Sequence, residues 1–296
     1  MRPFDKARRA AGRALLPWPD RRILDIASRE LLPAAGDEPP VGHMGSVAES
    51  LQRTLDPQLQ LLRRFEGPDF QELFAELRDD REINPGFGGR DYRAENLIHN
   101  GYYPTPDAEL YAALILDTAP ERIIEIGSGF STAVARTAIR YGGLATQLHV
   151  IDPAPRRSVE SLADRVEYTP VQASSLAEEC VPTNSIVFVD SSHVTRSGGD
   201  GPFLYGSLLP DLPPSVLVHV HDIFLPYDYP RVYVERLYTE QYLLQALMAN
   251  STKYEPVLAT YYLSREQAPA MRRVFGDAVA RDGDFEGASF WMRTVA

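Results

Sequence analysis

A short apolar run that ends in two closely spaced glycines constrains the fold of this chain more than any other feature. The run Arg122–Ile126 leads into Gly127-Ser-Gly129, and a stretch suited to a helix follows directly. A strand that turns through glycines into a helix begins a parallel α/β unit, and its bare turn lets a ligand approach the backbone. An acid, Asp152, follows at roughly the 20-residue spacing that suits a ribose diol. The sequence therefore predicts a site for a nucleoside-bearing cofactor.

Composition excludes several classes of protein. The chain has 296 residues, 44% of them hydrophobic, and a formal net charge of −11, whereas a general nucleic-acid binder needs a basic face. Cys180 is the only cysteine, so the sequence holds no intrachain disulfide and no cysteine metal cluster. No apolar run approaches membrane-spanning length and no signal peptide is recognisable. We expect a soluble cytoplasmic protein that binds neither nucleic acid nor membrane.

The chain divides into two regions of different pattern. Residues 1–100 contain stretches with helical periodicity and a Pro/Gly-rich break at 33–45, and we expect a helical extension that caps the substrate site or forms a homodimer interface. From residue 101 to 296, apolar strands alternate with helical stretches, which favours a parallel sheet covered on both faces. The final helix and strand leave room for an antiparallel edge strand. Strands are expected at 122–126, 147–151, 166–171, 185–189, 216–220, 256–263 and 288–294. The predicted fold class is α/β, a Rossmann-like, doubly wound, mostly parallel seven-stranded sheet.

The glycine turn departs from the dinucleotide-binding pattern at one position. Thr132 stands where that pattern has its third glycine, which weakens an NAD assignment. The segment Glu125-x-Gly127-x-Gly129 resembles motif I of the class I S-adenosylmethionine (AdoMet) methyltransferases. The resemblance implies that the glycine backbone lies along the methionine part of AdoMet and that Asp152 binds the ribose hydroxyls. It implies an AdoMet site formed by Glu125, Gly127, Ser128, Gly129, Ser131, Thr132, Asp152, Ala173, Ser174 and Asp190.

Two further strand ends carry residues of the kinds that bind ligands. One is Asp190-Ser-Ser-His193, and the other is His219-Val-His221-Asp222. The carboxyl ends of parallel strands meet at one edge of a sheet, so these side chains are expected near Gly127 and Asp152. Carboxylates and imidazoles that converge suggest a divalent metal. Oxygen ligands favour Mg²⁺, and a histidine ligand makes Mn²⁺ or, less readily, Fe²⁺ suitable.

These strand ends also resemble the metal-dependent O-methyltransferases of the catechol and macrolide-sugar types. The resemblance covers about residues 100–296 and implies metal ligands Asp190, His221 and Asp222, with Asp190 and His193 as catalytic residues and His193 as the base. The implied reaction is O-methylation of a small hydroxylated metabolite, a sugar or a natural product. His219 shares a strand face with His221 and is expected to be a hydrogen-bonded sheet residue.

Two other readings stay open at this point. A histidine pair with a carboxylate could hold Fe²⁺ in an enzyme of the same fold that does not methylate. The chain could also be an AdoMet-binding module without catalysis. The acceptor, the choice between oxygen and nitrogen, and the oligomeric state do not follow from the sequence.

Overall fold

We describe a computed structural model of the chain at residues 45–79, 96–276 and 287–296, apart from 157, 231–232 and 234–235. The chain divides into two compact units. One unit comprises Met1–Val41 with Tyr229–Tyr238, and the other comprises Gly42–Asp228 with Thr239–Ala296. All elements named below belong to the second unit. No helix among the described residues is long and apolar enough to cross a membrane.

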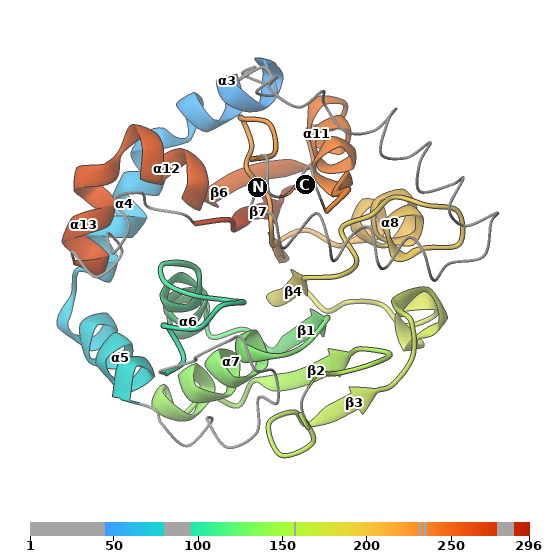
Figure 1. Cartoon of the computed structure of the whole chain (residues 1–296), viewed down its shortest axis with the longest axis horizontal. Helices are drawn as coiled ribbons and strands as arrows, with labels where there is room; N and C mark the ends of the chain where they lie inside the picture. The colour runs from blue at the N-terminus through green and yellow to red at the C-terminus, as the bar shows by residue number, and fades with distance from the viewer. Residues whose placement is uncertain (1–44, 80–95, 157, 231–232, 234–235, 277–286) are drawn as a thin grey trace, which may run out of the picture. The chain divides into compact units, whose positions relative to one another are not determined.

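A seven-stranded sheet in the order β3-β2-β1-β4-β5-β7-β6 forms the centre of this unit (Figure 1). Strands β1 to β5 pair in parallel, and β7 pairs antiparallel with both β5 and β6. The prediction of a mostly parallel, seven-stranded sheet with antiparallel pairing at one edge is confirmed. The strands are β1 (Arg122–Ile126), β2 (Gln147–Ile151), β3 (Arg165–Glu167), β4 (Ser185–Val189), β5 (Leu217–Val220), β6 (Tyr254–Ala259) and β7 (Phe290–Thr294).

The sequence explains why the middle strands lie inside. Every residue of β4 and β5 is buried, and β1 and β2 are buried except at their first residue. Such continuous apolar strands need cover on both faces of the sheet. Helices α6 (Asp107–Thr118) and α7 (Phe130–Tyr141) supply part of that cover and pack against each other.

Three N-terminal helices belong to the same compact unit as the sheet. They are α3 (Gly45–Arg53), α4 (Leu55–Phe65) and α5 (Pro68–Asp79). Helix α3 packs on β6, α4 on α13 and α5 on α6 and α7. The buried Gln58 accepts a hydrogen bond from the backbone N–H of Ala259 in β6, at 3.2 Å. A role of residues 1–100 as cap or dimer interface stays a prediction, and residues 1–44 and 80–95 lie outside the described residues.

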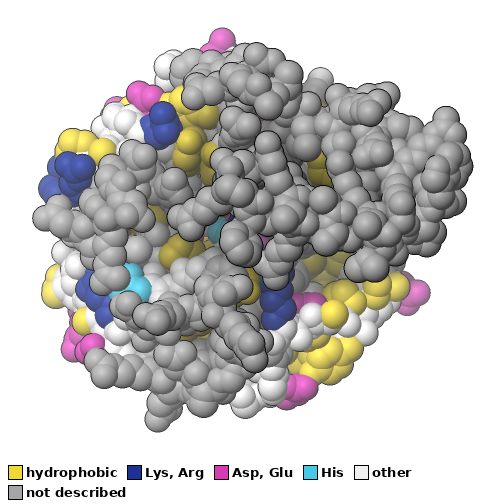
Figure 2. Space-filling view, in the orientation of Figure 1, with side chains coloured by type: hydrophobic (Ala, Val, Ile, Leu, Met, Phe, Trp, Pro, Cys, Tyr) yellow, Lys and Arg dark blue, Asp and Glu magenta, His cyan; other side chains and the backbone are white. Residues whose placement is uncertain are grey.

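The remaining helices follow or precede the later strands. Helix α8 continues into a π-helix, η3, and then into α9, and η3 contacts α11 (Figure 1). The bounds are η1 (Val171–Ala173), η2 (Ser175–Ala177), α8 (Asp200–Phe203), η3 (Leu204–Leu208), α9 (Leu209–Asp211), α11 (Glu240–Ala249), α12 (Thr260–Glu266) and α13 (Ala268–Phe275). On the face drawn in Figure 2, acidic and basic side chains are interspersed over the described part of the surface.

Two predicted strands, 166–171 and 256–263, run past the residues at which the structure ends them, and the predicted strands 216–220 and 288–294 begin one and two residues too early. Strand β3 ends at Glu167 rather than at residue 171, shortly before Pro170, which has no N–H to donate to a ladder. Strand β6 ends at Ala259, and the predicted strand residues 260–263 belong to helix α12 instead. Thr260 explains this end, because its hydroxyl accepts from the N–H of Ser289 (2.8 Å) and donates to the Ser289 carbonyl (3.1 Å). The backbone N–H of Thr260 still donates to the Ser289 carbonyl (2.9 Å), and the hydroxyl takes the place of the Thr260 carbonyl as the acceptor from Ser289.

Candidate active site

Four predicted site residues lie side by side at one edge of the sheet. Each is the first residue after a strand, and each donates its N–H to the last residue of the neighbouring strand. Gly127 donates to Ile151 (3.0 Å), Asp152 to Glu167 (3.0 Å), Asp190 to Ile126 (2.9 Å) and His221 to Val189 (2.9 Å). The ladder therefore continues for one residue beyond each strand and fixes the spacing of all four.

The glycine turn is in close contact with Asp190, the residue that follows β4. Gly127 has φ +88°, a conformation that favours glycine, and a β-carbon there would overlap the carbonyl oxygen of Asp190. At Gly129 a β-carbon would have no heavy atom within 4 Å, so space is open beside this part of the turn. The N–H of Gly129 donates to Oγ1 of Thr132 (3.1 Å), which fastens the turn to the first turn of α7. Thr132, which stands where the dinucleotide-binding pattern has its third glycine, therefore has a structural role.

Glu125 lies beneath the turn as a buried acid. Neither carboxylate oxygen has a hydrogen-bond partner among the described residues. Burial raises its pKa to about 8, although the nearby hydroxyls of Ser131 and Thr132 work in the opposite direction. The carboxyl is therefore protonated at neutral pH in the free protein, and a cationic ligand beside it would favour its charged form.

Asp152 presents its carboxylate beside the same turn. Oδ2 accepts from the Ser128 hydroxyl (2.6 Å), and Oδ1 accepts from the N–H of Ala154 (2.8 Å). The residue is half-buried, and each oxygen has a second lone pair that can accept from a ligand. A carboxylate held in this way can bind two neighbouring hydroxyls of a ribose.

Two residues of the predicted AdoMet site, Ala173 and Ser174, follow β3. Ala173 ends η1, and the Ser174 hydroxyl caps η2 by accepting from the N–H of Leu176 (3.3 Å). Ser174 also donates to the Val171 carbonyl (2.8 Å), so its side chain shapes the loop. The preceding Gln172 donates to the carbonyl of Gly198 (3.0 Å), which connects this loop with the one after His193.

His193 lies between two acids. Its Nε2 is 3.1 Å from Oδ1 of Asp190, and its Nδ1 is 2.8 Å from Oε2 of Glu240. The side chains of His193 and Glu240 are 6% and 3% exposed, whereas that of Asp190 is 32% exposed. Nδ1 therefore faces the protein interior, and Nε2 faces the accessible member of the cluster.

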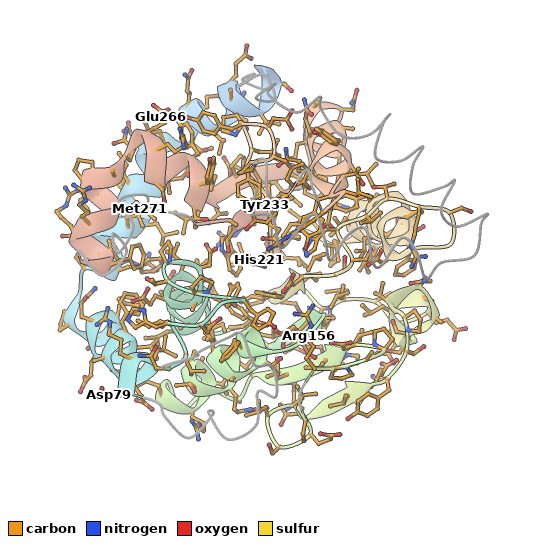
Figure 3. All side chains as sticks on the ribbon, viewed as in Figure 1. Asp79, Arg156, His221, Tyr233, Glu266 and Met271 are labelled. Atoms are coloured by element: carbon orange, nitrogen blue, oxygen red, sulfur yellow. The ribbon has the colours of Figure 1, made fainter. Side chains whose placement is uncertain are left out.

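His221 extends this cluster along β5, and it is labelled near the middle of Figure 3. Its Nδ1 lies 3.5 Å from Oδ1 of Asp190 and 3.8 Å from Oδ1 of Asp222. Its Nε2 lies 3.7 Å from Oδ2 of the buried Asp107, which also accepts from the N–H of Ala288 (2.8 Å). We call the six side chains of Asp107, Asp190, His193, His221, Asp222 and Glu240 the carboxylate–imidazole cluster.

Two members of the cluster have backbone conformations that are unusual for residues with a β-carbon. His193 has φ +58° and Asp222 has φ +56°. Left-handed residues of this kind cost stability and concentrate at functional sites. The turns after β4 and β5 thus bring the two side chains together, with Oδ2 of Asp222 3.6 Å from Nε2 of His193.

The charges in the cluster favour protonated imidazoles. Burial alone would lower the pKa of both histidines, but hydrogen bonds with Asp190 and Glu240 raise the pKa of His193 well above its usual range. The negative charges of Asp222 and Asp190 raise that of His221 in the same way. Burial would raise the pKa of Asp190, yet the two imidazoles hold it far below its ordinary value. The cluster is a set of mutually compensating charges.

The metal prediction finds no support in this geometry. Within the described part of the chain, no group of three or more His, Cys, Asp or Glu side chains is arranged to hold a metal ion. The oxygens of Asp190 and Asp222 lie 3.1–3.8 Å from the imidazole nitrogens of His193 and His221, so these side chains are paired with one another. We therefore derive no step through a metal.

His219 is a sheet residue, as the sequence interpretation proposed. Its Nε2 pairs with the Ser289 hydroxyl at 2.8 Å, and the side chain is fully buried. Its ring stacks on Phe188 of β4, with centroids 4.1 Å apart, and lies 4.5 Å from Trp291 of β7. Burial lowers its pKa, so His219 is a neutral member of an aromatic row across three strands.

Sequence reasoning missed Glu240 and Asp107. Both lie in the first turn of a helix, α11 and α6, where an acid is expected for the helix dipole alone. Only the tertiary fold brings them to the histidines. Asp107 belongs to the wider sequence pattern that carries the family resemblance, but that pattern gave it no role in the site, and Glu240 lies in no motif.

The known proteins that this chain resembles include methyltransferases. Residues 124–223, about a third of the chain, match a family model described as a methyltransferase domain. No curated protein matches the sequence. Among solved structures, a putative O-methyltransferase from Klebsiella pneumoniae is 14% identical over 78% of this chain and 91% of its own, with a TM-score of 0.43. An O-methyltransferase from Bacillus cereus in complex with SAH is 17% identical over 66% and 84%, with a TM-score of 0.41. A Mg-SAM structure of cmcI is 14% identical over 67% and 75%, also with a TM-score of 0.41. The family match spans β1, β2, β3, β4 and β5, which carry the sheet-edge residues described above.

Proposed function

We propose that this chain is a class I AdoMet-dependent methyltransferase and that it methylates an oxygen atom. The acceptor is a small hydroxylated metabolite, such as a sugar or a natural product. His193 is the base that receives the hydroxyl proton, and no cysteine or lysine in the cluster competes for this role.

The residues at the sheet edge suit AdoMet. Asp152 accepts hydrogen bonds from the ribose hydroxyls, and the open space beside Gly129 admits the methionine part close to the backbone. The buried carboxyl of Glu125 is neutral at pH 7 in the free protein, and a cofactor that carries positive charge would favour its negative form. When bound, AdoMet supplies an electrophilic methyl group. Ser128, Ser131, Thr132, Ala173 and Ser174 complete the proposed site.

One observation carries the proposal: the glycine turn and the carboxylate–imidazole cluster are in direct contact. Gly127 touches the backbone of Asp190, and Asp190 in turn contacts His193 and His221. A cofactor on the turn therefore places its reactive end beside the cluster. Holding a methyl donor and a base in contact supplies the alignment on which methyl transfer depends.

The orientation of His193 decides which atom moves the proton. Glu240 occupies Nδ1, so Nε2 is the nitrogen that can accept a proton. A hydroxyl that binds at the partly exposed Asp190 comes within reach of Nε2, since the two groups are 3.1 Å apart. As the oxygen attacks, its proton passes to Nε2, and the resulting imidazolium is stabilised by the surrounding carboxylates. Asp190 orients the acceptor.

The test is a turnover assay on the full chain. Wild-type protein is incubated with AdoMet and a panel of catechols and glycosides, and S-adenosylhomocysteine is measured together with the site of methylation. We expect an O-methylated product from wild type and a loss of about 100-fold or more in kcat for His193→Gln. Methylation at nitrogen, or undiminished turnover by His193→Gln, would refute the proposal.

A further inference from the structure

We infer that Glu240, held in turn by Tyr205, is a positioning residue for His193. This inference rests on the proposed function, in which His193 is the base. It adds a part of the protein, the start of α11 and the π-helix η3, that the motifs at the strand ends do not include.

Glu240 holds His193 by its side chain and by its backbone. Oε2 of its carboxylate lies 2.8 Å from Nδ1, and the two groups are buried. The N–H groups of Thr239 and Glu240 both donate to the carbonyl of His193, at 2.9 and 3.2 Å. The first turn of α11 therefore fixes the left-handed backbone of His193 as well as the direction of its ring.

Tyr205 fixes the carboxylate itself. Its hydroxyl donates to Oε1 of Glu240 at 3.0 Å, so each carboxylate oxygen has its own partner. Tyr205 lies in η3, a single π-helical turn between α8 and α9, and such turns often occur at functional sites. The side chains form an ordered row of Tyr205, Glu240, His193 and Asp190 from the interior toward the accessible end.

The row has a chemical consequence. Because Glu240 is an acceptor at Nδ1, the Nδ1 position of His193 keeps a proton in both of its charge states. The exchangeable position is then Nε2, on the side of Asp190 and Asp222. An imidazole without this partner would rotate or adopt the other tautomer, in which Nε2 holds the proton and cannot act as a base.

The experiment compares full-length Glu240→Gln and Tyr205→Phe with wild type. Glu266→Gln is the matched control, since Glu266 also accepts from a tyrosine, Tyr227, but lies on α12 outside the cluster. Selective ¹⁵N-histidine labelling detects the Nδ1–H of His193, assigned by its absence in His193→Gln. AdoMet affinity is measured by calorimetry, and kcat is measured with the acceptor that the turnover assay identifies.

We expect a hydrogen-bonded, downfield Nδ1–H signal in wild type, in Tyr205→Phe and in the control, and its loss in Glu240→Gln. We expect kcat to fall about 100-fold in Glu240→Gln and about tenfold in Tyr205→Phe, with AdoMet affinity unchanged within about twofold. The double variant His193→Gln/Glu240→Gln should be no slower than His193→Gln, because the two residues act as one unit.

Three results would overturn the inference. If Glu240→Gln keeps the signal and its kcat while His193→Gln is inactive, the proposed function stands and the positioning role is wrong. If His193→Gln is active, the proposed base and the positioning role are both wrong. If Glu240→Gln does not fold, the Nδ1–H signal of wild type and the kcat of Tyr205→Phe still test the inference. A wild-type Nδ1 without a hydrogen bond contradicts the inference directly.

Discussion

Gly127 lies so close to Asp190 that a β-carbon on the glycine would overlap the aspartate carbonyl oxygen. This contact joins the turn after β1 to the turn after β4, and through Asp190 it joins the proposed cofactor site to His193. The absence of a side chain at Gly127 is thus required by the protein itself, before any ligand is considered.

Gly127→Ala should therefore destabilise the protein without any ligand. The added carbon meets backbone rather than a flexible side chain, and the position has a positive φ, so we expect a loss of about 1–3 kcal/mol. Denaturant unfolding of the free protein measures this. Gly143→Ala is the comparison: Gly143 also has a positive φ, but a β-carbon there meets no heavy atom within 4 Å. Equal stability of the two variants would contradict the contact with Asp190.

Glu125 should make stability fall as the pH rises. Its folded pKa of about 8 lies above its ordinary value of 4.5, so between these pH values the folded state holds a proton that the unfolded state has lost. Stability is then lost as the pH rises through this window. Glu125→Gln removes the ionisation at nearly constant size. We expect the free energy of unfolding of the variant, relative to that of wild type, to be about 1–3 kcal/mol higher at pH 8 than at pH 5. Unfolding curves at the two pH values measure the difference, and parallel pH profiles for the two proteins would refute it.

The cluster predicts the direction of the pH–rate profile. Asp190, Asp222 and Glu240 face His193, and hydrogen bonds with Asp190 and Glu240 raise its pKa despite burial. A base must be unprotonated, so kcat/KM should rise with pH, with a midpoint above the ordinary histidine value of about 6.5. Asp222→Asn removes one negative charge and should move the midpoint to lower pH. A rate that falls with pH from 6 to 9 would exclude His193 as the base.

Chelation tests the account against a metal-dependent alternative. Because no described group of His, Cys, Asp and Glu is arranged to hold a metal, we expect EDTA-treated protein to keep its turnover. The measurement is S-adenosylhomocysteine formation before and after treatment, with metal content determined in parallel. A loss restored by Mg²⁺ or Mn²⁺ would establish a metal at the cluster. Stoichiometric iron with oxygen-dependent turnover would point to a non-methylating enzyme.

The sheet was predictable because its signals are local. The strands β1, β2 and β4 coincide with the predicted ranges, since each is a short apolar run followed by a turn. The same runs indicate the edge where Gly127, Asp152, Asp190 and His221 meet, because parallel strands end together. The expectation for His219 held for an equally local reason, its place two residues before His221 on one strand face.

The rest of the site depends on contacts between distant segments. Glu240 is 47 residues from His193, and its helical position gives an acid there an ordinary explanation. Asp107 meets His221 only because α6 begins beside the end of β5. The helix at 260–266 replaced a predicted strand end because the Thr260 hydroxyl pairs with the Ser289 backbone. None of these pairings has a signature within its own segment.

Calorimetric titration of AdoMet into the full chain tests the central claim most directly. We predict one binding site per chain, with an affinity that falls at least about tenfold in Asp152→Ala, because the ribose hydroxyls lose their acceptor. Asp164→Asn serves as the control. Asp164 directly precedes β3 and pairs with Arg136 rather than with the glycine turn. No heat of binding in wild type, or equal affinity in Asp152→Ala, would contradict the proposed cofactor site and the mechanism that depends on it.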